Sequence, residues 1–131
     1  MSFDRSRQVA SVLFEVASSS STNAELSARA DAQQLGDMTV MVTRYQSAGR
    51  ARLGRSWTAP PGASLAISVL LRPRLADGTA PTPEHFGWRP IIAGVAMTEA
   101  VTWALPSHEV GFKWPNDVLV GDRKICGVLA E

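Results

Sequence analysis

Cysteine is nearly absent from this sequence. Cys126 is the only one in 131 residues, so no internal disulfide can form, and we expect a reducing, cytoplasmic setting. Histidine is almost as rare: His85 and His108 are far apart and have no cysteine or carboxylate partners at ligand spacing, which argues against a zinc site. No Ser/His/Asp arrangement for nucleophilic catalysis is visible.

A large charge imbalance and long apolar runs are also missing. The net charge is +1 and the pI about 8.0, so global charge gives no reason to expect nucleic acid as a partner. Apolar runs such as residues 91–97 are far too short to span a bilayer, and residues 1–7 are polar, so we expect no membrane segment and no signal peptide. Hydrophobic residues make up 45% of the chain, which excludes a disordered protein and suits one domain with a real core.

Helix and strand patterns mix without strict alternation, which predicts an α+β fold. Residues 1–8 are polar and expected to be loose. Strands are expected over residues 9–16, 38–44, 65–71, 110–114, 118–120 and 124–130, and helices over residues 22–34 and 84–105.

Three local patterns support this assignment. Thr22 and Glu25 form a capping box that would begin the first helix. Residues 65, 67, 69 and 71 are apolar and alternate with smaller or polar ones, which predicts a half-buried strand. Residues 121–123 read as a tight turn between two hairpin strands.

The most informative stretch is an arginine- and glycine-rich loop at residues 45–57. From Gly49 to Trp57 it holds three arginines and two glycines. Arginine forks fit phosphate and carboxylate oxygens, and glycine lets the backbone approach a ligand, so we expect this loop to close over something anionic and phosphorylated. A charge run by itself is more often a solvated turn. A Walker-type phosphate loop is excluded, because Arg55 stands where lysine is needed and the prolines that follow cannot continue a helix.

A second polar cluster, Lys-Trp-Pro-Asn-Asp, occupies residues 113–117. Asn116 and Asp117 at a strand end can orient a ligand or Mg²⁺, and Lys113 can neutralise a phosphate. Taken alone, an ordinary Pro-Asn-Asp turn explains this cluster better. Lys124 and Gly127 likewise have a plain interpretation as a strand lysine and a bulge glycine.

Together, these motifs resemble biotin protein ligase in their order and spacing. The matching segments are Ser-Thr-Asn at residues 21–23, the glycine-arginine motif at 45–57, Lys-Trp-Pro-Asn-Asp at 113–117 and Lys-x-x-Gly at 124–127. The resemblance runs from about Val12 to Glu131 and implies a mixed sheet flanked by helices, of the biotin/lipoate ligase type that is similar to class II tRNA synthetases. One departure is Ala51, where the family usually has glycine. Its methyl group would restrict the loop if φ were positive there.

The resemblance covers only the first part of the family's catalytic domain. It implies a loose segment at residues 1–11 and a partial catalytic domain at residues 12–131, without the DNA-binding domain or the C-terminal barrel. Because Glu131 closes an apolar run without a cap, we expect the chain to be cut inside a larger domain.

The resemblance also implies a reaction. ATP with Mg²⁺ would adenylate the carboxylate of biotin, and biotin would then pass to a lysine of the biotin carboxyl carrier domain of an acyl-CoA carboxylase; no nucleic acid or membrane partner is expected. Catalytic roles would fall to Arg52 and Lys124. Biotin would be bound by Ser21, Thr22, Asn23, Gln46, Gly49, Arg50, Ala51, Arg52, Lys124 and Gly127. ATP or the adenylate would be bound by Arg50, Arg52, Arg55, Trp57, Lys113, Asn116 and Asp117, with Asn116 and Asp117 as the Mg²⁺ ligands.

Two alternatives remain beside this hypothesis. A relative of the same fold activates lipoate or another short acid, although the double-arginine loop with Trp57 is the biotin-ligase pattern. The other alternative is a catalytically incomplete fragment that binds biotin without turning it over.

Overall fold

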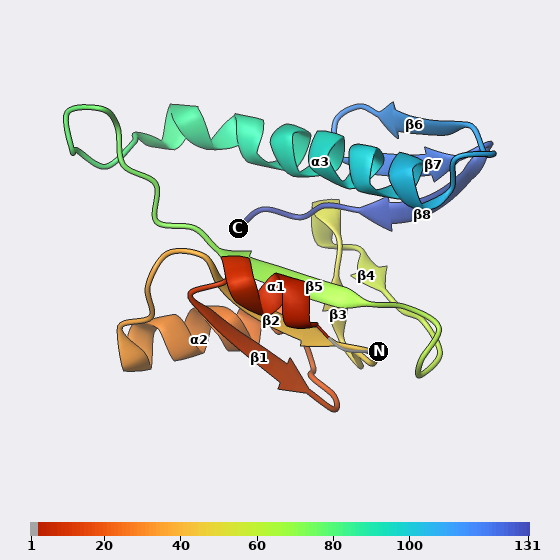
Figure 1. Cartoon of the computed structure of the whole chain (residues 1–131). Coiled ribbons are helices and arrows are strands. Elements are labelled where there is room, and N and C mark those ends of the chain that lie inside the picture. The colour runs from red at the N-terminus through yellow and green to blue at the C-terminus, as the bar shows by residue number, and fades with distance from the viewer. Residues whose placement is uncertain (1–2) are drawn as a thin grey trace. The chain divides into compact units, whose positions relative to one another are not determined.

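The computed structural model describes residues 3–131. These divide into two compact units, residues 3–78 and Thr79–Glu131. Both units combine helices with β-strands, which confirms the predicted α+β class (Figure 1). Within the described residues no helix is both long and apolar enough to cross a membrane.

The first unit is built on a mixed three-stranded sheet. Strand β2 (Thr39–Thr43) lies in the centre, parallel to β1 (Val12–Val16) and antiparallel to β5 (Ala66–Leu70). A central strand is covered on both faces, and the neighbouring residues Met41 and Val42, which point to opposite faces, are both buried.

Helix α2 (Thr22–Gln33) packs against β2 and β5 and covers one face of this sheet (Figure 1). Leu26 and Ala30 of the helix are buried, and the Arg29 guanidinium lies 4.9 Å from the centre of the Phe14 ring. Phe14 therefore points toward α2, and Glu15, the next residue of the strand, points to the opposite face.

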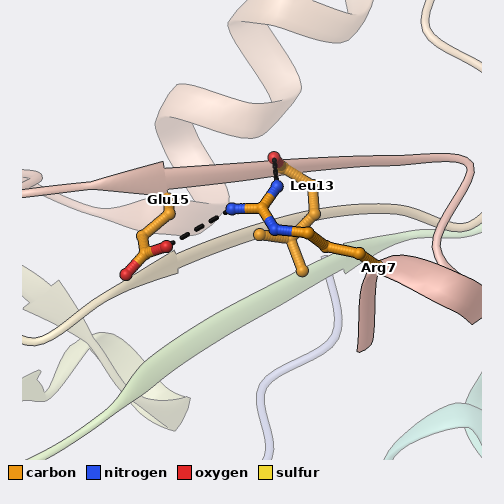
Figure 2. Close-up of polar contacts among 3 residues, drawn as sticks. All are labelled: Arg7, Leu13 and Glu15. Carbon is orange, nitrogen blue, oxygen red and sulfur yellow. Dashed lines mark hydrogen bonds and ion pairs between the residues drawn. The ribbon is translucent and has the colours of Figure 1, made fainter. Parts of the chain in front are cut away.

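The N-terminal segment is a short helix, α1 (Asp4–Val9), where a loose segment was expected. An acidic residue in its first turn and Arg7 in its last turn suit the helix dipole. Arg7 also ties the helix to β1, because its guanidinium lies 3.4 Å from the Leu13 carbonyl oxygen and 3.4 Å from the Glu15 carboxylate (Figure 2). Strand β1 consequently begins at Val12 and not at Val9. Residues 1 and 2 of the expected loose segment lie outside the described residues.

Strand β5 (Ala66–Leu70) confirms the predicted strand, but the side chains on its buried face are not the apolar ones that the pattern predicted. Ser68 is the buried residue, whereas Ile67 and Val69 are each 46% exposed. The reversal follows from the hydroxyl of Ser68, which points toward α2 and is hydrogen-bonded there. The alternating apolar side chains therefore point to the other face of the sheet.

A small antiparallel hairpin follows β2. It consists of β3 (Gly49–Arg50), a short 3₁₀ turn (η1, Arg52–Gly54) and β4 (Ser56–Trp57). The arginine-rich loop is thus a hairpin whose turn carries two of its three arginines.

The second unit packs one helix on an antiparallel sheet. A 3₁₀ segment (η2, Pro83–Trp88) leads into α3 (Arg89–Ala104), which confirms the predicted helix. The helix contacts β6 and β7 of a sheet with the order β6 (Val110–Lys113), β7 (Asp117–Val120) and β8 (Arg123–Gly127) (Figure 1). A Cβ atom on Gly94 would lie 2.2 Å from the ring of Phe112, so glycine allows this close approach of helix and sheet.

The hairpin of β7 and β8 is tighter than predicted. The turn consists of Gly121 and Asp122 alone, and Arg123 already belongs to β8. The strand ends at Gly127 where residue 130 was expected, although the Val128 N–H still donates to the Asn116 carbonyl oxygen beyond it.

Candidate ligand-binding site

A first group of predicted site residues lies at the N-terminus of α2. Ser21 caps this helix, since its hydroxyl oxygen accepts a hydrogen bond from the Ala24 N–H. The predicted capping box, with Thr22 as cap and Glu25 as its partner, is wrong by one residue, because Ser21 already has the extended backbone that a cap requires. The side chain of Thr22 is therefore available for contacts outside the helix.

Two loops run side by side next to this helix end. The parallel pairing of β1 and β2 continues beyond the strands, through a bridge between Ser19 and Gln46. The Ser19 N–H donates to the Tyr45 carbonyl oxygen at 3.1 Å, and the Ser47 N–H donates to the Ser19 carbonyl oxygen at 3.0 Å. This pairing places Gln46 next to the first turn of α2.

Gln46 and Thr22 are joined by two hydrogen bonds. The Gln46 Oε1 atom accepts from the Thr22 backbone N–H at 2.8 Å and from the Thr22 hydroxyl at 3.0 Å. Thr22 is only 3% exposed. Buried polar groups need such partners, so the bonds hold the Gln46 carboxamide in one orientation.

Gly49 lets the arginine-bearing hairpin approach Gln46. A Cβ atom at this buried position would lie 2.5 Å from Gln46 Nε2 and 2.5 Å from the Trp57 carbonyl oxygen. No side chain fits there without moving backbone. Close packing at this position therefore explains why the loop motif has a glycine there.

The predicted anion-binding arginines lie along the hairpin. Arg50, Arg52 and Arg55 are exposed, and the Arg55 Nε–H donates to the Arg52 carbonyl oxygen at 3.3 Å. The turn needs left-handed backbone at Gly54, with φ of +70°, and also at Leu53, with φ of 59°. Left-handed backbone is uncommon for leucine and costs about 1 kcal/mol.

Alanine at position 51 does not strain the hairpin. Its backbone is extended, with φ of −132°, and its N–H donates to the Arg55 carbonyl oxygen at 2.7 Å. Since any residue adopts this conformation, the concern raised by the missing glycine does not apply to this conformation of the loop.

Ser68 and Glu25 belong to the same region and were not predicted as site residues. The Ser68 hydroxyl contacts the Thr22 hydroxyl at 2.8 Å and also Asn23 Oδ1. Hydrogen bonds from the Ser19 hydroxyl and from Arg29 lower the pKa of the Glu25 carboxyl. The signal for Ser68 was its position as the single polar residue of a strand, which sequence reasoning assigns to solvent.

A second group of predicted site residues lies in the other unit, across β7 and β8. Asp117 and Gly127 are directly opposite each other, and the Lys124 Nζ atom lies 2.7 Å from Asp117 Oδ1. A Cβ atom on Gly127 would lie 3.0 Å from that same Nζ. Glycine thus leaves room for the lysine. The bulge of this ladder falls at Ile125, which has no partner in the register, and not at Gly127 as its plain interpretation expected.

Asn116 and Lys113 flank this ion pair. The Asn116 Nδ2 group donates to the Val128 carbonyl oxygen at 3.0 Å and ties the loop to the end of β8. Lys113 is exposed and lies opposite Asp117 on β6. Lys113, Asp117 and Gly127 therefore form a row across the three strands.

The thiol next to this row is poorly suited to nucleophilic chemistry. Burial raises the pKa of the Cys126 thiol, and the Asp117 carboxylate adds to this effect while the Lys124 ammonium opposes it. The thiol stays protonated near neutral pH, and thiolate is the reactive form.

A protein-bound Mg²⁺ finds little support in these residues. No group of three or more His, Cys, Asp or Glu side chains that could hold a metal ion occurs in residues 3–131. Asp117 is already paired with the Lys124 ammonium. The assignment of Asn116 and Asp117 as metal ligands stays a prediction, and the ion pair weighs against it for Asp117.

A cavity of about 220 Å³ lies elsewhere in the first unit, at the ends of β1 and β2. Glu15, Val42 and Arg44 are among its lining residues, and none of the predicted site residues lines it. It is smaller than the roughly 300–1,000 Å³ of typical ligand pockets. The predicted residues instead gather into two groups, one in each unit.

The comparisons with known proteins agree on one family. Residues 13–131 match the biotin/lipoate A/B protein ligase family. The chain is 41% identical over 118 residues to the biotin–[acetyl-CoA-carboxylase] ligase of Mycobacterium tuberculosis, a match that covers 88% of this chain and 42% of that protein. It is 36% identical over 115 residues to the bifunctional ligase/repressor BirA of Escherichia coli, covering 85% of this chain and 32% of that one.

Solved structures lead to the same family. The biotin protein ligase of Leishmania major in complex with biotinyl-5-AMP superposes with a TM-score of 0.71 at 28% identity, covering 91% of this chain and 51% of that one. The biotin protein ligase of Aquifex aeolicus in complex with biotin and ATP gives a TM-score of 0.70 at 29% identity, covering 92% and 47%.

The chain therefore belongs to the biotin/lipoate A/B protein ligase family. Its resemblance to the biotin protein ligases of that family is confirmed. It spans about half or less of the length of these curated and solved relatives.

Proposed function

We propose that this chain recognises biotin and takes part in its ATP-dependent activation and transfer to a protein lysine. The observation that carries the proposal is the hydrogen-bonded pair of buried Thr22 and half-buried Gln46, which lies beside Gly49 and the arginine-bearing hairpin. Related structures at 28% and 29% identity hold biotinyl-5-AMP, or biotin and ATP.

The proposed reaction has two steps. A carboxylate oxygen of biotin attacks the α-phosphorus of ATP, and pyrophosphate leaves. The amine of an acceptor lysine then attacks the acyl carbon, and AMP leaves. The first step brings negative charges together, and in the second, as the amine loses its proton, negative charge develops on the departing AMP, so fixed cationic donors lower both barriers.

The hairpin supplies such donors. We assign Arg50 and Arg52 to the biotin and adenylate, Arg55 to the phosphates, and Trp57 to packing against the adenylate. Ala51 and Gly49 contribute backbone to the same loop. Closure of the hairpin would exclude water from the reactive acyl phosphate.

The helix end and β8 supply the groups for biotin itself. Ser21, Thr22, Asn23 and Gln46 are assigned to the polar ureido ring. Lys124 is assigned to the carboxylate: an ammonium has three donors, so it can bind that group while keeping its bond to Asp117. Gly127 leaves the space that this lysine needs.

Mg²⁺ would enter with ATP, and Lys113 and Asn116 are assigned to the nucleotide. Because Asp117 is paired with Lys124, we place the ion with the phosphates and derive no step through a metal held by the protein. The acceptor we propose is the biotin carboxyl carrier domain of an acyl-CoA carboxylase, and the compartment is the cytoplasm.

A second candidate function is biotin binding without turnover. It is kept as an alternative because the match covers only 42% of the Mycobacterium tuberculosis relative. Activation of lipoate by the same fold is the less favoured candidate, since the related proteins named above are biotin ligases.

Isotope exchange between pyrophosphate and ATP tests the proposal. Exchange that depends on biotin supports activation of biotin. Exchange that depends on lipoate would instead identify lipoate as the acid that is activated. Saturable biotin binding in a sample that shows no exchange would favour the second candidate.

A further inference from the structure

Ser68 is the single polar residue of strand β5 and is only 5% exposed. Its hydroxyl lies 2.8 Å from the Thr22 hydroxyl and makes a short contact with Asn23 Oδ1. A serine buried among apolar neighbours in a strand is costly unless its hydroxyl is bonded, and both of its bonds go to the first turn of α2.

Each of these hydroxyls has a single proton, and this determines which group donates and which accepts in each hydrogen bond. Thr22 has one hydroxyl proton, which it donates to Gln46 Oε1 at 3.0 Å. The Thr22 oxygen then serves as an acceptor toward Ser68, whose single proton is shared between Thr22 and Asn23 Oδ1. The chain of donors therefore runs from Ser68 through Thr22 to Gln46.

This direction determines what Gln46 can offer a ligand. Both hydrogen bonds from Thr22 end on its Oε1 atom. The opposite end of the carboxamide, Nε2, lies toward Gly49 at the base of the hairpin. Gln46 thus presents N–H donors and no acceptor, which suits a carbonyl oxygen such as that of a urea.

We propose that Ser68 is a positioning residue that keeps Thr22 and Gln46 oriented for a ligand's carbonyl oxygen, and so sets the preference for biotin over acids without one. The proposal rests on the proposed function of this cluster. Without the Ser68 hydroxyl, the Thr22 hydroxyl can turn toward Asn23 and release one of the two bonds that orient Gln46.

Threonine and valine at position 68 give the cleanest test, because the two side chains have the same shape and differ in the hydroxyl alone. Calorimetry with biotin should show that Ser68→Val binds at least about tenfold more weakly than Ser68→Thr, a difference of about 1.4 kcal/mol. Affinity for lipoate, which has no carbonyl beyond its carboxylate, should be equal in the two variants. If Ser68→Val does not fold, Ser68→Ala compared with the unmodified chain takes its place with the same expected loss.

Thr39→Val is the matched control for simple loss of a buried hydroxyl. Thr39 is fully buried in the same sheet, but its hydroxyl donates to the Gly36 carbonyl oxygen at 2.9 Å and has no bond to Thr22 or Gln46. Thermal unfolding should show both valine variants destabilised, with biotin affinity reduced only in Ser68→Val. Equal biotin affinity of Ser68→Val and Ser68→Thr would overturn the role of Ser68, whereas absence of biotin binding by the unmodified chain would overturn the proposed function instead.

Discussion

Two glycines of the candidate site lie close to atoms that an added side chain would meet, with different consequences. A side chain on Gly49 would collide with Gln46 Nε2 and with the backbone of Trp57, both at 2.5 Å. A side chain on Gly127 would instead meet the end of the flexible Lys124 at 3.0 Å. Substitution of Gly49 therefore has to move the hairpin, whereas substitution of Gly127 only has to move a lysine away from Asp117.

Removal of the Lys124 ammonium should weaken biotin binding. Lys124→Ala is expected to lose about 1.5–3 kcal/mol of binding free energy, the usual worth of a hydrogen bond to a charged group. Calorimetry on the folded variant measures the loss, and Arg123→Ala, an exposed neighbour on β8, is the control. Unchanged affinity in Lys124→Ala would remove this residue from the site.

The Glu25 carboxylate predicts a pH dependence of stability. Hydrogen bonds from Ser19 and Arg29 lower its pKa in the folded state, so its contribution is present above the ordinary pKa of a glutamate and is lost as pH falls toward the lower folded value. Urea unfolding should therefore show a stability decrease in this acidic window that is smaller in Glu25→Gln. Identical pH profiles for the two proteins would refute the contribution.

At the scale of elements, the regular strands and long helices could be predicted from sequence, and their exact roles in the site could not. The patterns for β2, β6 and α3 follow directly from hydrophobic spacing. The helix α2 was predicted with the wrong cap, because Ser21 and Thr22 are both good caps and backbone conformation decides between them. That one-residue shift makes Thr22 a partner of Gln46.

Strand β5 shows why the partner of Thr22 was missed. A pattern of alternating apolar residues predicts that the apolar row is buried, but it carries no information about which face a helix will cover. The helix covers the face with Ser68, since hydroxyls there satisfy one another. The motif residues themselves, from Thr22 to Lys124, form a long, specific pattern, and their roles in binding stay predictions.

The hairpin of residues 49–57 should order when ligand binds. Its two strands have two residues each, its turn carries left-handed Leu53, and its arginines repel one another. Such a short hairpin is marginally stable by itself. Hydrogen exchange of amides 49–57 should be fast in the unliganded chain and slower with biotinyl-adenylate, and the amides of β2 serve as the internal control. Slow exchange that does not respond to the ligand would contradict this expectation.

At the scale of the whole molecule, exposed apolar surface predicts self-association. Ile92 and Trp103 of α3 are 66% and 81% exposed, and Trp88 before the helix is 65% exposed. Apolar surface of this kind favours association between copies. Sedimentation velocity should show an average mass that rises with protein concentration. The rise should be smaller in the double variant Ile92→Glu/Trp103→Glu. A monomer at all concentrations would contradict the prediction.

The central claim is that this chain recognises biotin through the cluster of Thr22 and Gln46 in its first unit. The most direct measurement is calorimetric titration of the chain with biotin and, separately, with lipoate, repeated on Gln46→Leu. The account predicts saturable binding of biotin, much weaker binding of lipoate, and loss of the biotin signal in a folded Gln46→Leu variant. Equal binding of the two acids, or undiminished biotin binding by Gln46→Leu, would contradict it.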